Sequence, residues 1–342
     1  MKINRFCARL VTTVVLCSAC FTSASATAQE TPASPSEPTR PQTGRPVRVV
    51  SIAFRPRPLE TITPLVDTEG AKGADLIVLP ETMLGQKQPQ SLDGLAVTTM
   101  ADLARKHRTY IVCSMDRLDG THRVNSTVLI DRAGKVVCVY DKVYPYWSEF
   151  DLKPPVEPRS KTPVYQADFG RVGMAICFDV NFPEVWKRLA DQGAELVVWP
   201  SAYSAGNSLR AHAINHHFYI VSCTYAPDCS VFDITGEEVL YEKGHDVQIT
   251  RATLDLDRGI YHTNFNVAKR DKLLKEHNDD VALEKQLERE AWFVLRAKRP
   301  GVSARELARR YGLEELRDYM DRSRREIDRM RERNDGANHG KH

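Results

Sequence analysis

A cysteine lies where a reactive group could be presented to a substrate. Residues 170–184 begin as a short, alternating apolar strand and end at Pro183, a residue typical of the first turn of a helix. Cys177 lies between the two. A cysteine on a tight turn from strand to helix presents its sulfur outward and has backbone N–H groups beside it, which suits a nucleophile with an oxyanion site. The alternative interpretation is a buried structural cysteine.

Two further reactive side chains follow strand-like segments. Glu81 ends a buried strand, and Lys142 follows the strand at residues 135–140 and begins an aromatic-rich loop that runs to residue 150. Taken singly, a glutamate at a strand end is usually solvated, and a lysine before such a loop is usually a surface residue. Together with Cys177 they supply a base, a cation and a nucleophile.

The elements that would position these residues form a weak internal repeat. Residues 73–81 and 193–201 are near copies, and each follows a helix that itself follows a strand. Two such halves, each with helices on one sheet face, predict an α/β fold in which sheet packs on sheet in a four-layer αββα sandwich. Glu81 and Ser201 then lie at equivalent strand ends, where α/β proteins build their sites.

The remaining elements follow from periodicity and turn residues. The predicted helices cover residues 59–72, 92–107 and 208–217. The predicted strands cover residues 47–54, 109–115, 124–131, 135–140, 218–224, 230–234 and 247–256.

The N-terminal residues predict export. In residues 1–28, basic residues precede an apolar run, and residues 26–28 form a small-residue cleavage site, as in a secretory signal peptide. The alternative is a lipoprotein signal that ends at Cys20, although the residues before it fit lipid attachment poorly. Residues 29–46 are rich in Pro, Ser and Thr and predict a flexible linker. We therefore expect a periplasmic or extracellular protein.

The C-terminal residues are dense in charge. Residues 269–333 predict a charged helical extension, with helices over residues 269–298 and 303–333. A capping box at residues 303–306 opens the second helix. Residues 334–342 are expected to be disordered.

Composition limits the classes of function. The 342 residues are 42% hydrophobic and 27% charged, which suits one large domain with additions or two modest ones. A net charge of +3 is too weak to indicate a nucleic-acid partner, and no hydrophobic span follows the signal to hold the chain in a membrane. Five cysteines follow the signal, so at least one thiol is free, and Cys223 and Cys229 could bridge a loop.

These motifs together resemble the nitrilase superfamily of carbon–nitrogen hydrolases. The matching segments are residues 79–81 around Glu81, 140–145 around Lys142, and 176–179 with 182–184 around Cys177. The resemblance spans residues 47–256 and assigns residues 47–268 to a hydrolase domain. It implies the αββα sandwich, a homodimer or larger homo-oligomer, and a thiol mechanism with no metal or organic cofactor.

The resemblance also implies roles for single residues. Glu81 would act as general base and then acid, and Lys142 would stabilise the oxyanion together with the backbone N–H of Phe178. The acyl-thioester on Cys177 would then be hydrolysed. Many members use a second glutamate, for which Glu149 is the candidate and Glu157 the alternative.

The sequence signals for substrate-binding residues are less specific than those for the catalytic residues. Tyr146 and Trp147 could wall a pocket, or they could be ordinary loop packing. Phe178, Asn181 and Ser201 are further candidates for substrate binding.

One segment departs from the family. Where the family often has Arg-Ala-x-Glu-Asn, residues 212–216 read His-Ala-Ile-Asn-His, so substrate assignments from well-known branches become doubtful. The histidines here are expected to be structural or pocket-lining rather than metal ligands.

The hypothesis is an exported hydrolase of a small linear amide or an N-carbamoyl compound. The alternatives are a nitrile hydrolase, an acyltransferase that uses the same triad, and a non-catalytic binding module.

Overall fold

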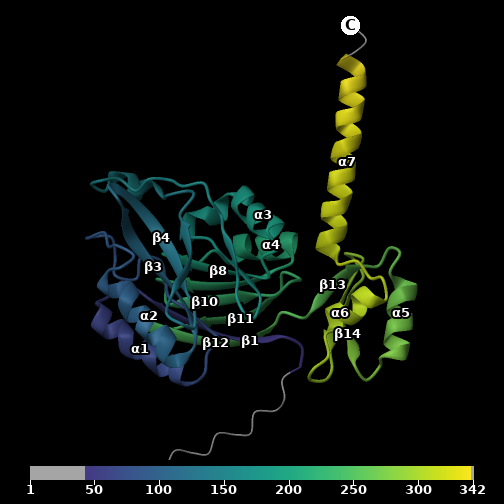
Figure 1. Cartoon of the computed structure of the whole chain (residues 1–342), viewed down its shortest axis with the longest axis horizontal. Coiled ribbons are helices and arrows are strands. Elements are labelled where there is room, and N and C mark those ends of the chain that lie inside the picture. The colour runs from purple at the N-terminus through teal and green to yellow at the C-terminus, as the bar shows by residue number, and fades with distance from the viewer. Residues whose placement is uncertain (1–42, 340–342) are drawn as a thin grey trace, which may run out of the picture. The chain divides into compact units, whose positions relative to one another are not determined.

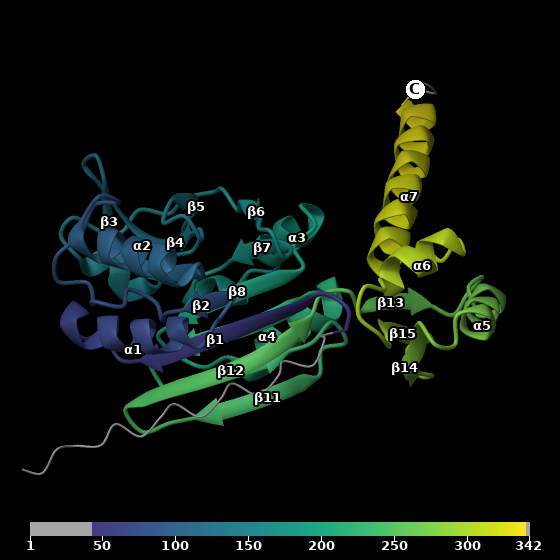
Figure 2. The ribbon, with the colours of Figure 1, turned by 60° about the horizontal axis from the view of Figure 1, so that its bottom comes forward.

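The computed structural model describes residues 43–339 and contains two six-stranded sheets (Figures 1 and 2). The predicted catalytic residues follow strands of these sheets. The first sheet has the order β12 (Val247–Asp255), β1 (Pro46–Phe54), β2 (Leu76–Val78), β3 (Tyr110–Asp119), β4 (His122–Ile130) and β5 (Val136–Asp141). The second has the order β11 (Glu238–Lys243), β10 (Asp228–Phe232), β9 (Tyr219–Thr224), β8 (Leu196–Ser201), β7 (Arg171–Met174) and β6 (Val164–Gln166).

Each sheet contains the predicted repeat. In the first sheet, α1 (Leu59–Ala71) joins the parallel strands β1 and β2, and α2 (Leu95–His107) joins β2 to β3. In the second, α3 (Pro183–Asp191) joins β7 to β8, and α4 (Gly206–His216) joins β8 to β9. Parallel strands with helical crossovers are buried on both faces, which explains their continuous apolar sequences.

The side chains of β1 separate two layers of the core. Val49 and Ala53 lie in the cluster that contains buried residues from both sheets. Val50, Ile52 and Phe54 point the other way, into the cluster built with α1 and α2. This period of two places helices on one face of the first sheet and the second sheet on the other. The predicted αββα class is therefore confirmed.

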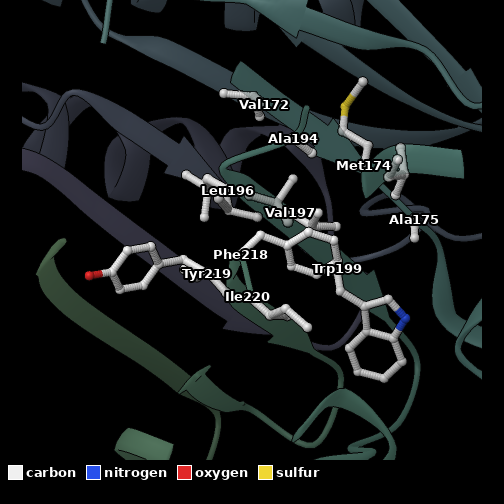
Figure 3. Close-up of a cluster of buried hydrophobic side chains, with 14 of the residues drawn as sticks. Val172, Met174, Ala175, Ala194, Leu196, Val197, Trp199, Phe218, Tyr219 and Ile220 are labelled. Carbon is white, nitrogen blue, oxygen red and sulfur yellow. The ribbon is translucent and has the colours of Figure 1, made fainter. Parts of the chain in front are cut away.

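The second sheet is packed by large apolar side chains. Figure 3 shows Val172 and Met174 of β7, Leu196 and Trp199 of β8, and Ile220 of β9 in this core. All five cysteines in the described part of the chain are free and buried. Cys223 and Cys229 therefore form no disulfide with each other here.

The C-terminal extension differs from the helical prediction. After α5 (Val267–Glu276) come β14 (Val281–Leu287) and β15 (Trp292–Ala297), which pair with β13 (Gly259–His262) in a three-stranded sheet. The prediction of helix over residues 269–298 is wrong beyond Glu276. Charged residues are common on exposed helices, but here Phe293, Leu295 and Ala297 form a buried strand face that packs against α6 (Ala304–Arg310).

The end of the extension is helical. Ser303 accepts a hydrogen bond from the backbone N–H of Glu306 at 3.1 Å, which is half of the predicted capping box. Helix α7 (Leu316–His339) continues through residues 334–339, which were expected to be disordered. Within residues 43–339, no helix combines the length and the apolar character needed to cross a membrane.

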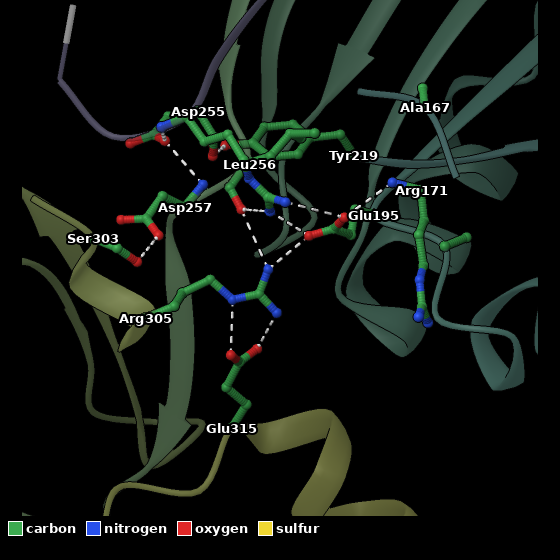
Figure 4. A network of polar contacts seen from close by, with 12 residues as sticks. Ala167, Arg171, Glu195, Tyr219, Asp255, Leu256, Asp257, Ser303, Arg305 and Glu315 are labelled. Atoms are coloured by element: carbon green, nitrogen blue, oxygen red, sulfur yellow. Dashed lines mark hydrogen bonds and ion pairs between the residues drawn. The ribbon is translucent and has the colours of Figure 1, made fainter. Parts of the chain in front are cut away.

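A half-buried acidic residue, Glu195, connects the C-terminal extension to the start of β8 (Figure 4). Glu195 accepts hydrogen bonds from Arg305 Nη1 at 2.8 Å and from the backbone N–H of Arg171 at 3.0 Å, and it pairs with Arg45. Burial opposes its ionisation, but the two arginines hold the pKa of Glu195 below its usual value. Arg45 belongs to the predicted flexible linker, of which residues 29–42 lie outside the described residues. The last residues of that segment are therefore held in place.

Histidines at the end of α4 predict a loss of stability in acid. Burial, as the largest cause, lowers the pKa of His216 and of His217 to about 4. Both rings are then neutral in the folded protein, whereas in the unfolded chain they bind protons below about pH 6.5. The free energy of unfolding should fall as the pH drops from 6.5 towards 4, by at most about 3 kcal/mol for each ring.

Urea unfolding between pH 7 and 4.5 tests this expectation. Asparagine at both positions should make the free energy of unfolding depend less on pH. His245→Asn, at an exposed histidine, should leave this pH dependence as in the wild type. An unchanged profile in the double variant would contradict it.

Candidate active site

Cys177 begins a 3₁₀ helix, η2 (Cys177–Asn181), between β7 and α3. Its φ of 44° is a strained, left-handed conformation for a residue other than glycine, of the kind that collects at functional sites. Asp179 holds the turn, because its carboxylate accepts the backbone N–H groups of Ile176 at 3.0 Å and Tyr144 at 2.8 Å. Trp199 Nε1 donates to the carbonyl of Cys177 at 3.1 Å. The turn is thus tied to β8 and to the loop after Lys142.

Lys142 is the buried cation of the site. Its side chain is 1% exposed, and its ammonium donates to Glu81 Oε1 at 2.8 Å and to Glu149 Oε2 at 2.6 Å. Burial alone would lower the pKa of Lys142, but the negative charges of Glu81 and Glu149 raise it above its usual value. The lysine is therefore charged although it is buried.

Glu149 is the glutamate that the structure places against Lys142. It lies on a second 3₁₀ helix, η1 (Trp147–Asp151), and its carboxylate also accepts Asn125 Nδ2 at 2.7 Å, Gln86 Nε2 at 3.0 Å and the backbone N–H of Tyr146 at 2.7 Å. The alternative, Glu157, is half-buried and pairs instead with His122 at 2.8 Å and with Arg159.

Asn125 is a residue that the sequence analysis missed. It is fully buried on β4, and its Nδ2 donates to Glu81 Oε1 at 2.8 Å as well as to Glu149. The amide therefore bridges the two carboxylates. The available signal was a run of polar residues, Arg123 and Asn125 to Thr127, in a strand that is almost entirely buried, because buried polar groups require partners.

The Cys177 thiol is protonated in this environment. Burial raises its pKa to about 12, and the negative charge of Glu81 acts in the same direction. Lys142, the Ser201 hydroxyl and the backbone N–H of Ala202 act in the opposite direction. A reaction at this sulfur consequently needs a base that removes the thiol proton as the bond forms.

The residues predicted to bind substrate differ from one another in exposure and in their contacts. Phe178 is half-buried, and its ring lies edge-on to that of Tyr146, with the centroids 5.3 Å apart. Trp147 is 77% exposed. Asn181 is exposed and donates to the carbonyl of Phe178 at 3.1 Å, and buried Ser201 hydrogen bonds to the backbone of Tyr203.

The histidines of residues 212–216 are packing residues. His212 stacks on Trp186 with ring centroids 4.3 Å apart, and its Nε2 lies 2.8 Å from the carbonyl of Val180. No group of three or more potential metal-ligating side chains occurs in the part of the chain that the structure describes.

The Carbon-nitrogen hydrolase family model matches residues 58–258. The chain belongs to this family. The matched range of this carbon-nitrogen hydrolase contains Glu81, Lys142, Glu149 and Cys177, and the extension from β13 to α7 follows it.

Relatives and solved structures agree with this assignment. A nitrilase and fragile histidine triad fusion protein of Caenorhabditis elegans is 30% identical over 191 residues, which are 46% of this chain and 42% of that protein. The deaminated glutathione amidase of Synechocystis is 26% identical over 193 residues, 48% of this chain and 70% of its own.

Two solved structures share the fold of this carbon-nitrogen hydrolase. Saccharomyces cerevisiae Nit3, a member of branch 10 of the nitrilase superfamily, has a TM-score of 0.55 and 20% identity, and covers 66% of this chain and 95% of its own. An amidase from Nesterenkonia sp. has a TM-score of 0.54 and 21% identity, over 62% of this chain and 91% of its own. The protein is a hydrolase of the nitrilase superfamily that acts on carbon–nitrogen bonds.

Proposed function

We propose that this enzyme cleaves a small linear amide or an N-carbamoyl compound through an acyl-thioester on Cys177. The observation that carries the proposal is the Lys142 ammonium, which is held between Glu81 at 2.8 Å and Glu149 at 2.6 Å and whose charge acts on the pKa of Cys177. A buried cation fixed in this way stabilises negative charge without having to reorganise. Relatives that are named amidases support an amide substrate.

The proposed reaction begins at the sulfur. The Cys177 sulfur attacks the carbonyl carbon while Glu81 takes the thiol proton, and the oxyanion forms beside Lys142 and the backbone N–H of Phe178. Glu81 then gives the proton to the leaving nitrogen as the carbon–nitrogen bond breaks. A water molecule attacks the thioester, Glu81 takes one of its protons, and the carboxylic product leaves as the thiol is restored.

The contacts assign different roles to the two glutamates. Glu149 accepts hydrogen bonds from Lys142, Asn125, Gln86 and the backbone of Tyr146, which fix the position of its carboxyl group so that it orients the lysine. The contacts of the Glu81 carboxylate within residues 43–339 both use Oε1. Its Oε2 remains for proton exchange with sulfur, nitrogen and water.

Ammonia release from a mixed panel tests the proposal. The panel contains short amides, N-carbamoyl amino acids and nitriles, and the protein is assayed under reducing conditions. Release from amides or N-carbamoyl compounds supports the proposal, and release from nitriles alone identifies a nitrile hydrolase. Transfer to an added amine without hydrolysis identifies an acyltransferase. Failure of every member, with Cys177 unreactive to iodoacetamide, supports a binding module.

Alkylation of Cys177 should have a steep pH dependence. Because the thiol pKa is raised to about 12, the thiolate fraction grows about tenfold for each pH unit and does not level off below pH 9.5. Iodoacetamide labelling of the Cys177 peptide, followed by mass spectrometry from pH 7 to 9.5, measures this rate. The peptide with buried Cys113 is the internal control. A plateau with a midpoint near pH 8 would show that Lys142 holds a preformed thiolate instead.

Export is a further part of the proposal. We propose export to the periplasm or outside the cell through the signal peptide at residues 1–28, which lie outside the described residues. A mature chain that begins at Gln29 in the exported fraction would support it, and an uncleaved cytoplasmic chain would contradict it.

The enzyme is also proposed to be a homodimer or larger homo-oligomer. The exposed Met320, Ile327 and Met330 on α7, which are 51%, 47% and 48% exposed, support a second copy packed on this helix. Light scattering should give at least twice the chain mass, and Ile327→Asp should lower it. A monomer at every concentration would contradict this expectation.

A further inference from the structure

Exposed aromatic side chains gather beside the proposed catalytic residues. Trp147 is 77% exposed, Tyr146 51% and Phe150 46%, and all three belong to the segment that also carries Glu149. We call these three residues the aromatic rim. Aromatic side chains of this size usually bury most of their surface, so a group of three exposed in one turn requires an explanation.

The rim is connected to the reacting centre by ring contacts. Tyr146 lies edge-on to Phe178, with centroids 5.3 Å apart, and Phe178 directly follows Cys177. Trp147 lies edge-on to Phe150 at 6.5 Å. The rim therefore contacts the residue that follows the proposed nucleophile in the chain.

The backbone under the rim is rigidly held. The backbone N–H of Tyr146 donates to Glu149, whose carboxylate also accepts Lys142, Asn125 and Gln86. Rings that face solvent from such a fixed support are already arranged for a ligand, which lowers the entropy cost of binding.

A buried ion pair fixes the neighbouring loops. Arg123 pairs with Asp116 at 2.7 Å, and both side chains are at most 3% exposed. The same guanidinium donates to the carbonyls of Gln86 at 2.6 Å and Pro154 at 3.2 Å, on either side of the rim in the sequence. The rim is therefore supported from both loops.

The charge pattern indicates what the rim accepts. Residues 143–150 contain a single ionisable acidic or basic side chain besides tyrosine, Glu149, and that side chain is buried against Lys142. The next charged side chains, Asp151 and Lys153, are exposed and opposite in sign, so together they add no net charge beside the rim. The rim offers ring faces and edges and no surface charge. We propose that the substrate carries a neutral aromatic group, which stacks on Trp147 and Tyr146 while its amide lies at Cys177. This inference rests on the proposed function and names its substrate class.

Two amides that differ only in a phenyl group test the inference. The ratio of kcat/KM for 3-phenylpropionamide to that for propionamide should be at least about tenfold in the wild type. Trp147→Ala should reduce this ratio severalfold, and Trp147→Phe should retain most of it. Phe265→Ala, at an aromatic residue that is 86% exposed on the extension, is the matched control and should leave the ratio unchanged. A ratio near one in the wild type, or an equal fall for both amides in Trp147→Ala, would overturn the inference.

Binding to the Cys177→Ala variant separates this inference from the proposed function. Tryptophan fluorescence or calorimetry should show tighter binding of 3-phenylpropionamide than of propionamide, and Trp147→Ala should remove the difference. If the wild type hydrolyses neither amide but this preference is present, the proposed chemistry fails and the aromatic site stands. Equal binding of both ligands would overturn the aromatic site. An unchanged ratio together with a lower oligomer mass in Trp147→Ala would also overturn it, because the rim would then be covered by a second copy.

Discussion

Replacement of Cys177 by alanine is expected to abolish ammonia release, with a loss on the order of 10⁵-fold or more. The reason is that no acyl-thioester can form, and the base and cation around the sulfur then have no nucleophile to assist. The protein should remain folded. Loss of one buried sulfur costs about 1 kcal/mol, and the left-handed backbone of residue 177 is as strained for alanine as for cysteine.

A matched control separates loss of the nucleophile from loss of packing. Cys113 is also buried, but it lies in the cluster between the first sheet and its helices. Cys113→Ala should have a similar cost in stability and retain turnover. Both variants would be compared in ammonia release and in thermal unfolding. Turnover retained in Cys177→Ala would refute the mechanism, whatever its stability.

Lys142→Met is expected to lower turnover by several orders of magnitude and also to destabilise the fold. Methionine has a similar length but supplies no charge for the oxyanion. Glu81 and Glu149, which are 5% and 4% exposed, would face each other without their shared cation. Removal of one partner from a buried ion pair costs about 3–5 kcal/mol. Urea unfolding at pH 7 measures this loss of stability, and ammonia release measures the loss of turnover.

Two further variants serve as controls for Lys142. Lys142→Met combined with Glu149→Gln should recover much of the stability but none of the turnover, because one of the opposed charges is removed. Lys135→Met, at an exposed lysine, should match the wild type in both measurements. Turnover of Lys142→Met within about tenfold of the wild type would contradict the assigned role of the ammonium.

Local patterns in the chain were sufficient to predict the architecture and to nominate three candidate site residues. The near copies at residues 73–81 and 193–201 predict two equivalent strand–helix–strand units, since a buried parallel strand and its crossover helix are set by neighbouring residues. Cys177 could be identified because a strand, a turn and a helix start adjoin it. Glu81 and Lys142 could be identified because strands end at them.

The extension and the signal illustrate where local patterns were insufficient. Residues 281–287 place Glu284, Lys285 and Gln286 among apolar residues, and such a mixture suits an exposed helix or the open face of a strand equally. These residues form a strand because β14 pairs with β15, and this pairing joins residues that are not neighbours in the sequence. The predicted signal peptide lies outside the described residues and remains a prediction.

The hydrogen bonds that hold Lys142 and Glu81 in place depended on the tertiary fold. Glu149 and Glu157 both lie in the segment between Lys142 and Cys177, yet of the two only Glu149 lies within hydrogen-bonding distance of Lys142. Asn125 reaches both Glu81 and Glu149 from β4. These contacts depend on strand register and on how the loops close over the strand ends. Residue types and short-range periodicity specify which elements form, but hydrogen bonds between residues many positions apart exist only once those elements have packed.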